Sequence, residues 1–396
     1  MQSTALPILL DGLTDDERHA LLTDQSLSTL PAAFAAVPDP RSRHGQRYAM
    51  PFLLTCLVAA LLCNCNSLEA VGQWCRDQRT LLVRCFPHQR FHTPSGSLYR
   101  RLLPRLSVGH IEAAVAAWVR ATRPLRDREP VALDGKTVRG AGTATQPAPH
   151  LLSVSRHQTH ETLVQVRVPA ETNEIPLAQA LLPHRPLRGR VVTADALHTQ
   201  TALAQTVLAH GGAYLLCVKG NQPRLYEELA FYFAAPHATA RQATTVDRRR
   251  GRTETRTLHV TTRLNAYLMR YFGFPRLGQV AHLTRTVRDR TGTHTEVVYL
   301  ITSLTPRQAA PTGLLALIRG HWSVESRHWI RDVTFGEDRS RLRCGHAPQI
   351  MAALRNLALT LIRRTGTTAI AAYRRHLAAH PAKALRLLLP KTRSRR

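Results

Sequence analysis

The stretch VALDGKTVRG (131–140) decides the fold class, because a β-branched and apolar run leads there into an aspartate, Asp134. The stretch VVTADALHTQ (191–200) repeats this plan with Asp195. Similar short runs alternate with helical patterns, which predicts a mixed α/β sheet flanked by helices. In such a sheet the two strands can lie side by side. Both aspartates would then emerge at one edge, where the ligand sites of open sheets form.

A third acidic residue belongs to the helical pattern HWSVESRHWIRDVTFGED (321–338), which contains Glu325. Mg²⁺ prefers hard oxygen ligands, and two such ions that share carboxylates can drive phosphodiester chemistry. We therefore predict that Asp134 bridges two Mg²⁺ ions, which Mn²⁺ can replace. Asp195 and Glu325 would complete the two coordination shells.

Each of these acids also has a purely structural explanation when it is considered alone. Asp134 precedes a glycine and could end its strand in a turn. Asp195 could cap the helix that follows it. Glu325 could pair with a nearby arginine, either Arg327 or Arg331.

The charge of the chain indicates its partner. The 396 residues include 54 Lys and Arg against 26 Asp and Glu, which gives a formal net charge of +28. Most of the basic residues are arginine, whose planar guanidinium matches phosphate well. A hydrophobic content of 44% excludes a disordered chain. We expect double-stranded DNA as the partner and no membrane, because no basic amphipathic anchor is present. A codon-driven excess of arginine is the alternative explanation.

Cysteine usage and the amino terminus indicate a cytoplasmic protein. The seven cysteines include no C-x-x-C pair, so we expect reduced and mostly buried thiols. A zinc site formed by Cys75, Cys85, His88 and His92 is the less favoured alternative. The first residues show no secretory signal, and the apolar run 52–65 is too short to span a bilayer.

Changes of pattern divide the chain into five predicted segments. Helical spacing fills the first, and short strands alternating with helices fill the second. A polar, β-rich insertion separates the second from the fourth, which holds the helix of Glu325. The predicted segments are a helical domain (1–125), the first part of the core (126–235), the insertion (236–298), the rest of the core (299–365) and a basic helical tail (366–396).

The predicted helical domain contains a candidate DNA-binding element. Two expected helices, at roughly 95–105 and 107–122, carry a basic face that includes Arg100, Arg101 and Arg105. These helices could form a helix-turn-helix laid against DNA. An ordinary packing domain with a solvated basic face explains the pattern equally well.

Further side chains are expected near the three acids. His321, His328 and Asp332 share one helix face with Glu325. They are candidate auxiliary residues, with Asp332 either a fourth acid near the metals or the partner of a histidine. Side chains just past the strand ends, and arginines at the edge of the insertion, are expected to contact DNA: Lys136, Arg139, Lys219, Asn221, Gln222, Arg250 and Arg252.

These blocks resemble those of DDE transposases from bacterial insertion sequences, and more narrowly the H-repeat-associated group. The resemblance runs in order from about residue 35 to 362, and the block around Glu325 is its most specific part. The stretches DPRSRHGQRY (39–48) and SLEAVGQW (67–74) are similar to the helical domain of that group. The matching core blocks are DGKTVRG (134–140), TNEI (172–175), DALHTQ (195–200), VKGNQ (218–222), GRTETR (251–256) and HWSVESRHWIRDVTFGEDRSRLR (321–343).

The resemblance implies an RNase H-like catalytic fold with a β insertion between the second aspartate and the glutamate. It implies that Asp134, Asp195 and Glu325 bind the metal ions and that a homodimer assembles on DNA. Wider relatives carry a Tyr-Arg-Glu-Lys pattern on the glutamate helix. That pattern is mostly lost here, with His321 and Asp332 at two of its positions, so the handling of DNA ends by those relatives does not carry over.

The sequence thus predicts an insertion-sequence transposase that works in the cytoplasm, at the bacterial nucleoid. It would cleave DNA strands at the ends of its element and transfer the 3′-hydroxyl to target DNA by in-line attack. Two alternatives use the same residues or the same charge. One is an RNase H-like nuclease that hydrolyses DNA without strand transfer, and the other is a catalytically silent, domesticated DNA-binding protein.

Overall fold

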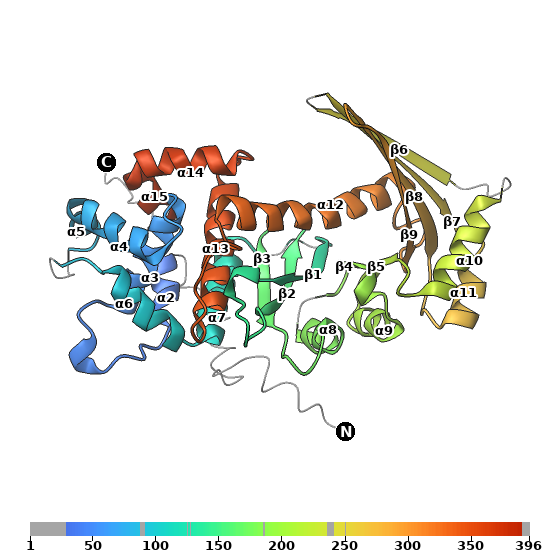
Figure 1. Cartoon of the computed structure of the whole chain (residues 1–396). Helices are drawn as coiled ribbons and strands as arrows, with labels where there is room; N and C mark the ends of the chain where they lie inside the picture. Colours follow the sequence, from blue (N-terminus) through green and yellow to red (C-terminus); the bar gives the residue numbers. More distant parts are fainter. Residues whose placement is uncertain are drawn as a thin grey trace, which may run out of the picture.

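A computed structural model describes residues 29–87, 92–124, 126, 128–184, 187–235, 241–249 and 251–389. Figure 1 shows a helical domain, a central sheet and a long β ribbon arranged one after another across the molecule. The helix that carries Glu325, α12 (Pro311–Trp329), runs over the sheet and connects the ribbon to the helical domain. None of the described helices is long and apolar enough to cross a membrane.

The helical domain is built around α3 (Met50–Leu62), an apolar helix whose residues are nearly all buried. The next long helix begins after Ser67, whose hydroxyl caps it by accepting a hydrogen bond from the Ala70 N–H at 3.1 Å. All seven cysteines are free thiols, and His88 of the zinc alternative lies outside the described residues. The other helices of this domain are α2 (Leu30–Ala35), α4 (Leu68–Asp77), α5 (Arg79–Cys85), α6 (Gly96–Leu102) and α7 (Val108–Thr122).

The last of these helices, α7, is enclosed by the protein. It packs against α13 (Ala347–Arg364) and β3 (Thr162–Arg167), and its residues are buried or half-buried as far as Arg120. A recognition helix has to lie open before it can enter a DNA groove. The packing-domain interpretation therefore fits α7, whereas α6 keeps Arg100 at the surface.

In the described part of the chain, nine strands form one mixed sheet in the order β3-β2-β1-β4-β5-β9-β8-β7-β6. Strands β1, β4 and β5 are parallel, and the other neighbours pair antiparallel. The first five strands of this order form the RNase H-like core that the resemblance implies. The strands not yet bounded are β1 (Val131–Thr137), β2 (His150–Arg156), β4 (Val191–Ala194), β5 (Ala213–Val218), β6 (Arg241–Arg249), β7 (Arg252–Thr261), β8 (Gln279–Asp289) and β9 (Gly292–Thr302).

The β-rich insertion extends the core sheet. Strand β9 pairs antiparallel with β5, so the hairpins β6–β7 and β8–β9 continue the hydrogen-bonded ladder beyond the core. Within the second hairpin, the register runs from Gln279 opposite Thr302 to Asp289 opposite Gly292. Gly251 adopts a left-handed φ of 78° in the turn between β6 and β7, which glycine accepts without strain. The polar pattern of the insertion did not indicate the helix α11 (Asn265–Phe272).

Helices cover both faces of the core sheet. In Figure 1, α8 and α9 lie below it, while α12 crosses above it. The contacts agree, since α12 packs on β1 and β4, α8 on β2, and α9 on β5. The helices that complete the core are α8 (Glu174–Leu181), α9 (Thr201–Ala209) and α10 (Pro223–Ala234), and a π-helical turn (Ile330–Thr334) continues α12.

The segment after α13 returns to the helical domain. Helices α14 (Ile370–Ala379) and α15 (Pro381–Leu388) pack against α3 and place Leu377 in the same apolar cluster. The buried Arg374 guanidinium donates to the Leu61 carbonyl at 2.7 Å. The sequence predicted a basic helical tail at 366–396, and the described residues 366–389 are helical but packed into a domain. Residues 390–396 lie outside the described residues.

A buried ionic cluster fixes the chain just after the π-helical turn. Glu337 is fully buried, and its carboxylate contacts Arg331 at 2.7 Å and Arg355 at 3.4 Å. Burial alone would raise the pKa of Glu337, but the two guanidinium groups outweigh it and the pKa is lowered. The cluster joins the end of the Glu325 helix to α13.

Replacing this carboxylate should destabilise the fold. Glu337→Gln leaves two buried guanidinium groups without their charge partner, so we expect unfolding to become easier by about 3–5 kcal/mol. Urea denaturation at neutral pH measures this difference. The control is Glu296→Gln, which removes a half-exposed carboxylate that contacts Arg285 at 3.1 Å and should cost at most about 1 kcal/mol. Equal losses of unfolding free energy in the two variants would contradict the stabilising role of the buried Glu337 cluster.

Candidate active site

Parallel pairing brings the two predicted aspartates to the same level of the sheet. Leu133 in β1 lies beside Ala194 in β4, so the next residues along the two strands are Asp134 and Asp195. Asp134 is not in a turn, because β1 continues through Thr137. Asp195 precedes a single turn of 3₁₀ helix, and its side chain makes no capping hydrogen bond. Neither structural explanation of the aspartates accounts for these positions.

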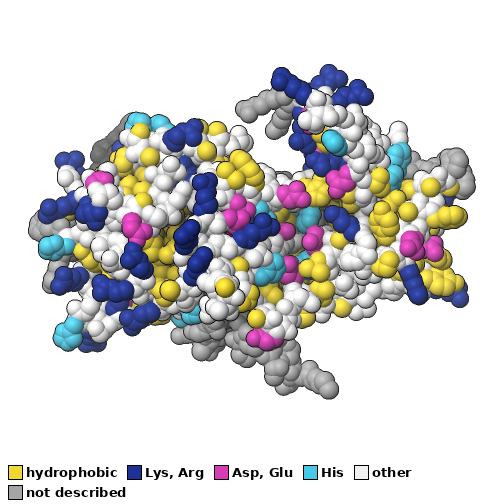
Figure 2. All heavy atoms as spheres, in the orientation of Figure 1, with side chains coloured by type: hydrophobic (Ala, Val, Ile, Leu, Met, Phe, Trp, Pro, Cys, Tyr) yellow, Lys and Arg dark blue, Asp and Glu magenta, His cyan; other side chains and the backbone are white. Residues whose placement is uncertain are grey.

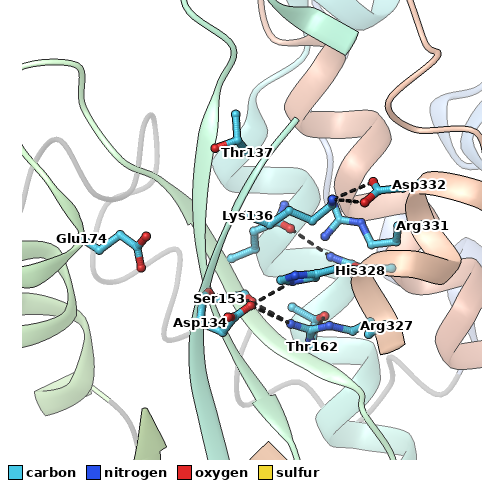
Figure 3. A network of polar contacts seen from close by, with 12 residues as sticks. Asp134, Lys136, Thr137, Ser153, Thr162, Glu174, Arg327, His328, Arg331 and Asp332 are labelled. Atoms are coloured by element: carbon cyan, nitrogen blue, oxygen red, sulfur yellow. Dashed lines mark hydrogen bonds and ion pairs between the residues drawn. The ribbon is translucent and has the colours of Figure 1, made fainter. Parts of the chain in front are cut away.

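Asp134 faces the helix α12 (Figure 3). Its Oδ2 lies 2.9 Å from His328 Nε2 and 4.0 Å from an Arg327 guanidinium nitrogen. Burial tends to raise the pKa of Asp134, but these contacts outweigh it and the pKa is lowered. Arg327 is itself held by Ser153 at 3.1 Å and by Thr162 at 3.4 Å, and burial lowers its pKa to about 10. The carboxylate of Asp134 is therefore held from the helix side in a buried cationic setting.

Asp195 has the opposite electrostatic setting. Its pKa is raised, first because the surrounding protein desolvates the carboxyl and then because Glu174 and Asp134 add negative charge. Its turn is held from the loop after β5, where Asn221 donates to the Ala196 carbonyl at 2.6 Å. Two carboxylates at one level of adjacent strands therefore form an acidic edge that favours the approach of a cation.

The third predicted acid, Glu325, is exposed on α12. It does not pair with either arginine that the sequence offered, because Arg331 contacts Glu337 and Arg327 contacts Ser153 and Thr162. Among the described residues, no group of three or more His, Cys, Asp or Glu side chains is placed so that it could hold a metal ion. The structure therefore brings the two aspartates together and leaves the glutamate apart from them, on the helix that faces Asp134.

The three candidate auxiliary residues attach α12 to the sheet. His321 is buried and its Nδ1 lies 3.0 Å from the Thr193 hydroxyl of β4. Asp332 accepts from the Lys136 ammonium of β1 at 2.6 Å, so it is the partner of a lysine and not of a histidine. Together with the contact of His328 to Asp134, these interactions fix the register of the helix against β1 and β4.

The predicted DNA contacts differ in accessibility, and four of them already contact other groups of the protein. Arg139 and Lys219 are exposed, each just past the end of a core strand. Lys136 is buried against Asp332, so a contact with DNA would require that ion pair to open. The amides of Asn221 and Gln222 donate to carbonyls of the Asp195 loop, so they position this loop. In the insertion, Arg252 contacts Glu254 at 3.3 Å, and Arg250 lies outside the described residues.

Glu174, to which the sequence analysis assigned no role, lies on the face of β1 opposite to Asp134 (Figure 3). Glu174 is buried, and its two oxygens contact His150 Nε2 at 2.5 Å and His198 Nε2 at 2.8 Å. Two hydrogen bonds to histidines outweigh burial and lower the pKa of Glu174 to about 2. The backbone N–H of His198 also donates to the Asp195 carbonyl at 3.2 Å. Glu174 thus supports the turn of the second aspartate.

The sequence contained a signal for this support. Glu174 belongs to the TNEI block and His198 to the DALHTQ block, and both blocks were identified without a role for these side chains. A Cβ at Gly135 would overlap the Glu174 carboxylate, so glycine is needed where β1 passes over it. Only the folded arrangement reveals this close approach.

Comparison with known proteins assigns the chain to a family. Residues 125–361 match the family described as Transposase DDE domain, and residues 32–119 match one described as DDE_Tnp_1-associated. The chain therefore belongs to the DDE transposases, and the predicted resemblance is confirmed.

Individual relatives are similar over most of their length. The chain is 25% identical to "Putative transposase YncI" of Escherichia coli O157:H7, over 85% of this chain and 88% of that protein. It is 23% identical to "H repeat-associated putative transposase YhhI" of E. coli strain K12, over 85% and 90% of the two chains. Among solved structures, a piggyBac transposase synaptic complex with hairpin DNA aligns with a TM-score of 0.43 and 12% identity, over 95% of this chain and 82% of that one.

The Glu174 network predicts a distinctive pH dependence of stability. The pKa of Glu174 is depressed, so its contribution is complete above the ordinary value of 4.5 and is lost as the pH falls towards 2. The pKa of His150 is raised, so its contribution is complete below 6.5 and is lost as the pH rises through the folded value. Both contributions are present together between these two ordinary values.

Urea denaturation of the wild type and of Glu174→Gln near pH 3, 5.5 and 9 tests this expectation. The difference in unfolding free energy should be largest at about pH 5.5 and smaller at both extremes. A difference that stays constant across the three conditions would show that the charges of Glu174 and His150 do not stabilise the fold.

Proposed function

We propose that the protein is an insertion-sequence transposase that cleaves DNA strands at the ends of its element and transfers the 3′-hydroxyl to target DNA. The catalytic residues in this proposal are Asp134, Asp195 and Glu325, acting with two Mg²⁺ ions. The observation that carries it is the position of the two aspartates at one level of adjacent parallel strands. Membership of the DDE transposases supports the same assignment.

The two aspartates are suitable ligands for divalent metal. Their oxygens are the hard donors that Mg²⁺ prefers. A cation beside Asp195 would offset the desolvation and the neighbouring negative charge that raise the pKa of its carboxyl. Glu325 has to approach from α12, and that approach is part of the proposal. When bound, Mg²⁺ stabilises the negative charge that develops at the phosphate during cleavage.

The side chains of the protein have separate tasks in this proposal. His328 and Arg327 orient Asp134, while Asn221 holds the turn of Asp195. Exposed basic side chains near the acidic edge contact phosphates on either side of the cleaved bond, and Arg139 is one of these.

The charge of the surface supports DNA as the substrate. In Figure 2, acidic and histidine side chains group near the middle of the visible face, where α12 crosses the sheet. Lys and Arg side chains are frequent over the helical domain and near the tip of the β ribbon. DNA that contacts both basic regions would pass the acidic edge. We propose that two copies act together, because two element ends have to be processed, and that they act on DNA in the bacterial nucleoid.

Removal of any one acid should abolish cleavage and spare DNA binding. We expect Asp134→Asn, Asp195→Asn and Glu325→Gln each to slow metal-dependent cleavage by about a thousandfold or more, because each removes part of several kcal/mol of charge stabilisation. Cleavage of end-containing DNA with Mg²⁺ measures the rate, and a gel-shift assay in a chelator measures binding. The control is Glu296→Gln in the insertion, which should leave both unchanged. Cleavage at wild-type rate by any of the three variants would refute its catalytic role.

A pre-cleaved DNA end separates a transposase from a nuclease of the same fold. With Mg²⁺ and target DNA, we expect the free 3′-hydroxyl to be joined to the target, because its attack on phosphorus needs the same site as hydrolysis. A joined product on a denaturing gel supports strand transfer. Nicked target without a joined product would favour the nuclease, and intact DNA in both assays would favour a silent DNA-binding protein.

A further inference from the structure

A polar pocket of about 440 Å³ adjoins the flank of α12, on the other side of the helix from the sheet contacts of His321 and His328. It lies between α12, the turn from β2 to β3, and the end of α13 with the loop that follows. Ser326 of α12 lines it, and this residue directly follows Glu325. Successive residues of a helix differ in direction by about 100°. The pocket therefore lies about a quarter of a turn around the helix from the side chain of the proposed catalytic glutamate.

Positive charge in this pocket exceeds negative charge. Three arginines line it, Arg123, Arg363 and Arg364, against one carboxylate, Glu161. Glu161 is already shared, because it contacts Arg364 at 2.8 Å and Arg123 at 3.5 Å. Within the described part of the chain, Arg363 makes no ion pair with a carboxylate. Burial lowers its pKa to about 10, so its charge is both desolvated and uncompensated.

Hydrogen-bond donors around this charge also lack partners. One guanidinium nitrogen of Arg363, one of Arg364 and the Thr159 hydroxyl are buried and have no hydrogen-bond partner within the described structure. All three residues line the pocket, together with Ser326 and Thr368, which both carry hydroxyl groups. Buried donors without acceptors are costly, so this lining suits an acceptor-rich anion.

We propose that this pocket binds a backbone phosphate of the DNA strand that passes over α12. The choice of DNA rests on the function proposed above and on position. The surface of α12 beside Glu325 is open, with Trp329 61% exposed, so a strand at the glutamate can continue around the helix to Ser326. Arginine is suited to this contact, because its planar group donates two parallel hydrogen bonds to phosphate.

Two changes of the full-length protein reduce the positive charge of the pocket in different ways. Arg363→Gln removes the uncompensated guanidinium. Thr368→Glu adds a carboxylate at an exposed position of the lining, where substitution should not disturb packing. The matched controls are Thr368→Gln, which has a similar size and no charge, and Arg386→Gln, which removes an exposed arginine of α15 that does not line the pocket.

The first measurement uses inorganic phosphate as the probe without DNA. At matched ionic strength, phosphate should raise the Tm of the wild type and of both controls above the value in chloride. This rise should be absent in Arg363→Gln and Thr368→Glu. A rise of the same size in all five proteins, or in none of them, would overturn the site.

The second measurement assigns the phosphate to DNA. A labelled duplex is titrated with the wild type, Thr368→Glu, Arg363→Gln and Thr368→Gln over a range of salt, in a chelator so that no strand is cut. Loss of one phosphate contact should reduce the slope of log K against log salt by about 0.9 in the first two variants and leave Thr368→Gln unchanged. Unchanged slopes together with a phosphate effect on Tm would show a free-anion site and overturn the assignment to DNA.

These results do not depend on catalysis. If the variants of Asp134, Asp195 and Glu325 still cleave DNA, the proposed chemistry fails while the pocket can still pass both measurements. If the pocket variants behave like the wild type, the pocket assignment fails while the chemistry can still hold.

Discussion

The parallel pairing of β1 with β4 is the constraint on which the site depends. Because Leu133 lies beside Ala194, two aspartates that are far apart in the chain reach the same level of the sheet. The alternation of side chains along β1 then sends Asp134 towards α12 and leaves Gly135 over Glu174. A shift of one residue in this register would exchange the two faces and separate the aspartates.

Helix α12 is the second element of the site, and polar contacts determine its position. Three side chains of α12 and of the π-helical turn that continues it reach the core strands, through His321 to Thr193, His328 to Asp134 and Asp332 to Lys136. Its far end is held by Glu337, which connects the chain to α13. The same helix joins the β ribbon to the helical domain. Glu325 can therefore approach the aspartates in two ways: the helix moves and changes these contacts, or the Glu325 side chain alone rotates.

Several arginines are buried in this protein, and they differ in whether a partner offsets their charge. Arg327, Arg331 and Arg355 are each almost fully buried, and each has a polar partner that fixes its direction. Arg363 differs, because it lines a pocket whose one carboxylate, Glu161, contacts Arg364 and Arg123 instead. In a chain with a net charge of +28, removing the partner of a buried arginine is costly, and the uncompensated Arg363 is where we propose that an external phosphate binds.

The sequence by itself determined the fold class, the family, the strand of Asp134, the strand that ends just before Asp195, and the long helix of Glu325. Periodicity and motif order are local properties of the chain, so they can be recognised without the fold. It did not reveal that the insertion continues the core sheet, that α14 and α15 pack into the helical domain, or that Lys136 pairs with Asp332, since these depend on contacts between distant segments. The support of Asp195 by Glu174 and the pocket beside Ser326 are likewise tertiary features. Hydrogen bonding and burial decide which charged groups are engaged and which remain open, and both are set only when the chain has folded.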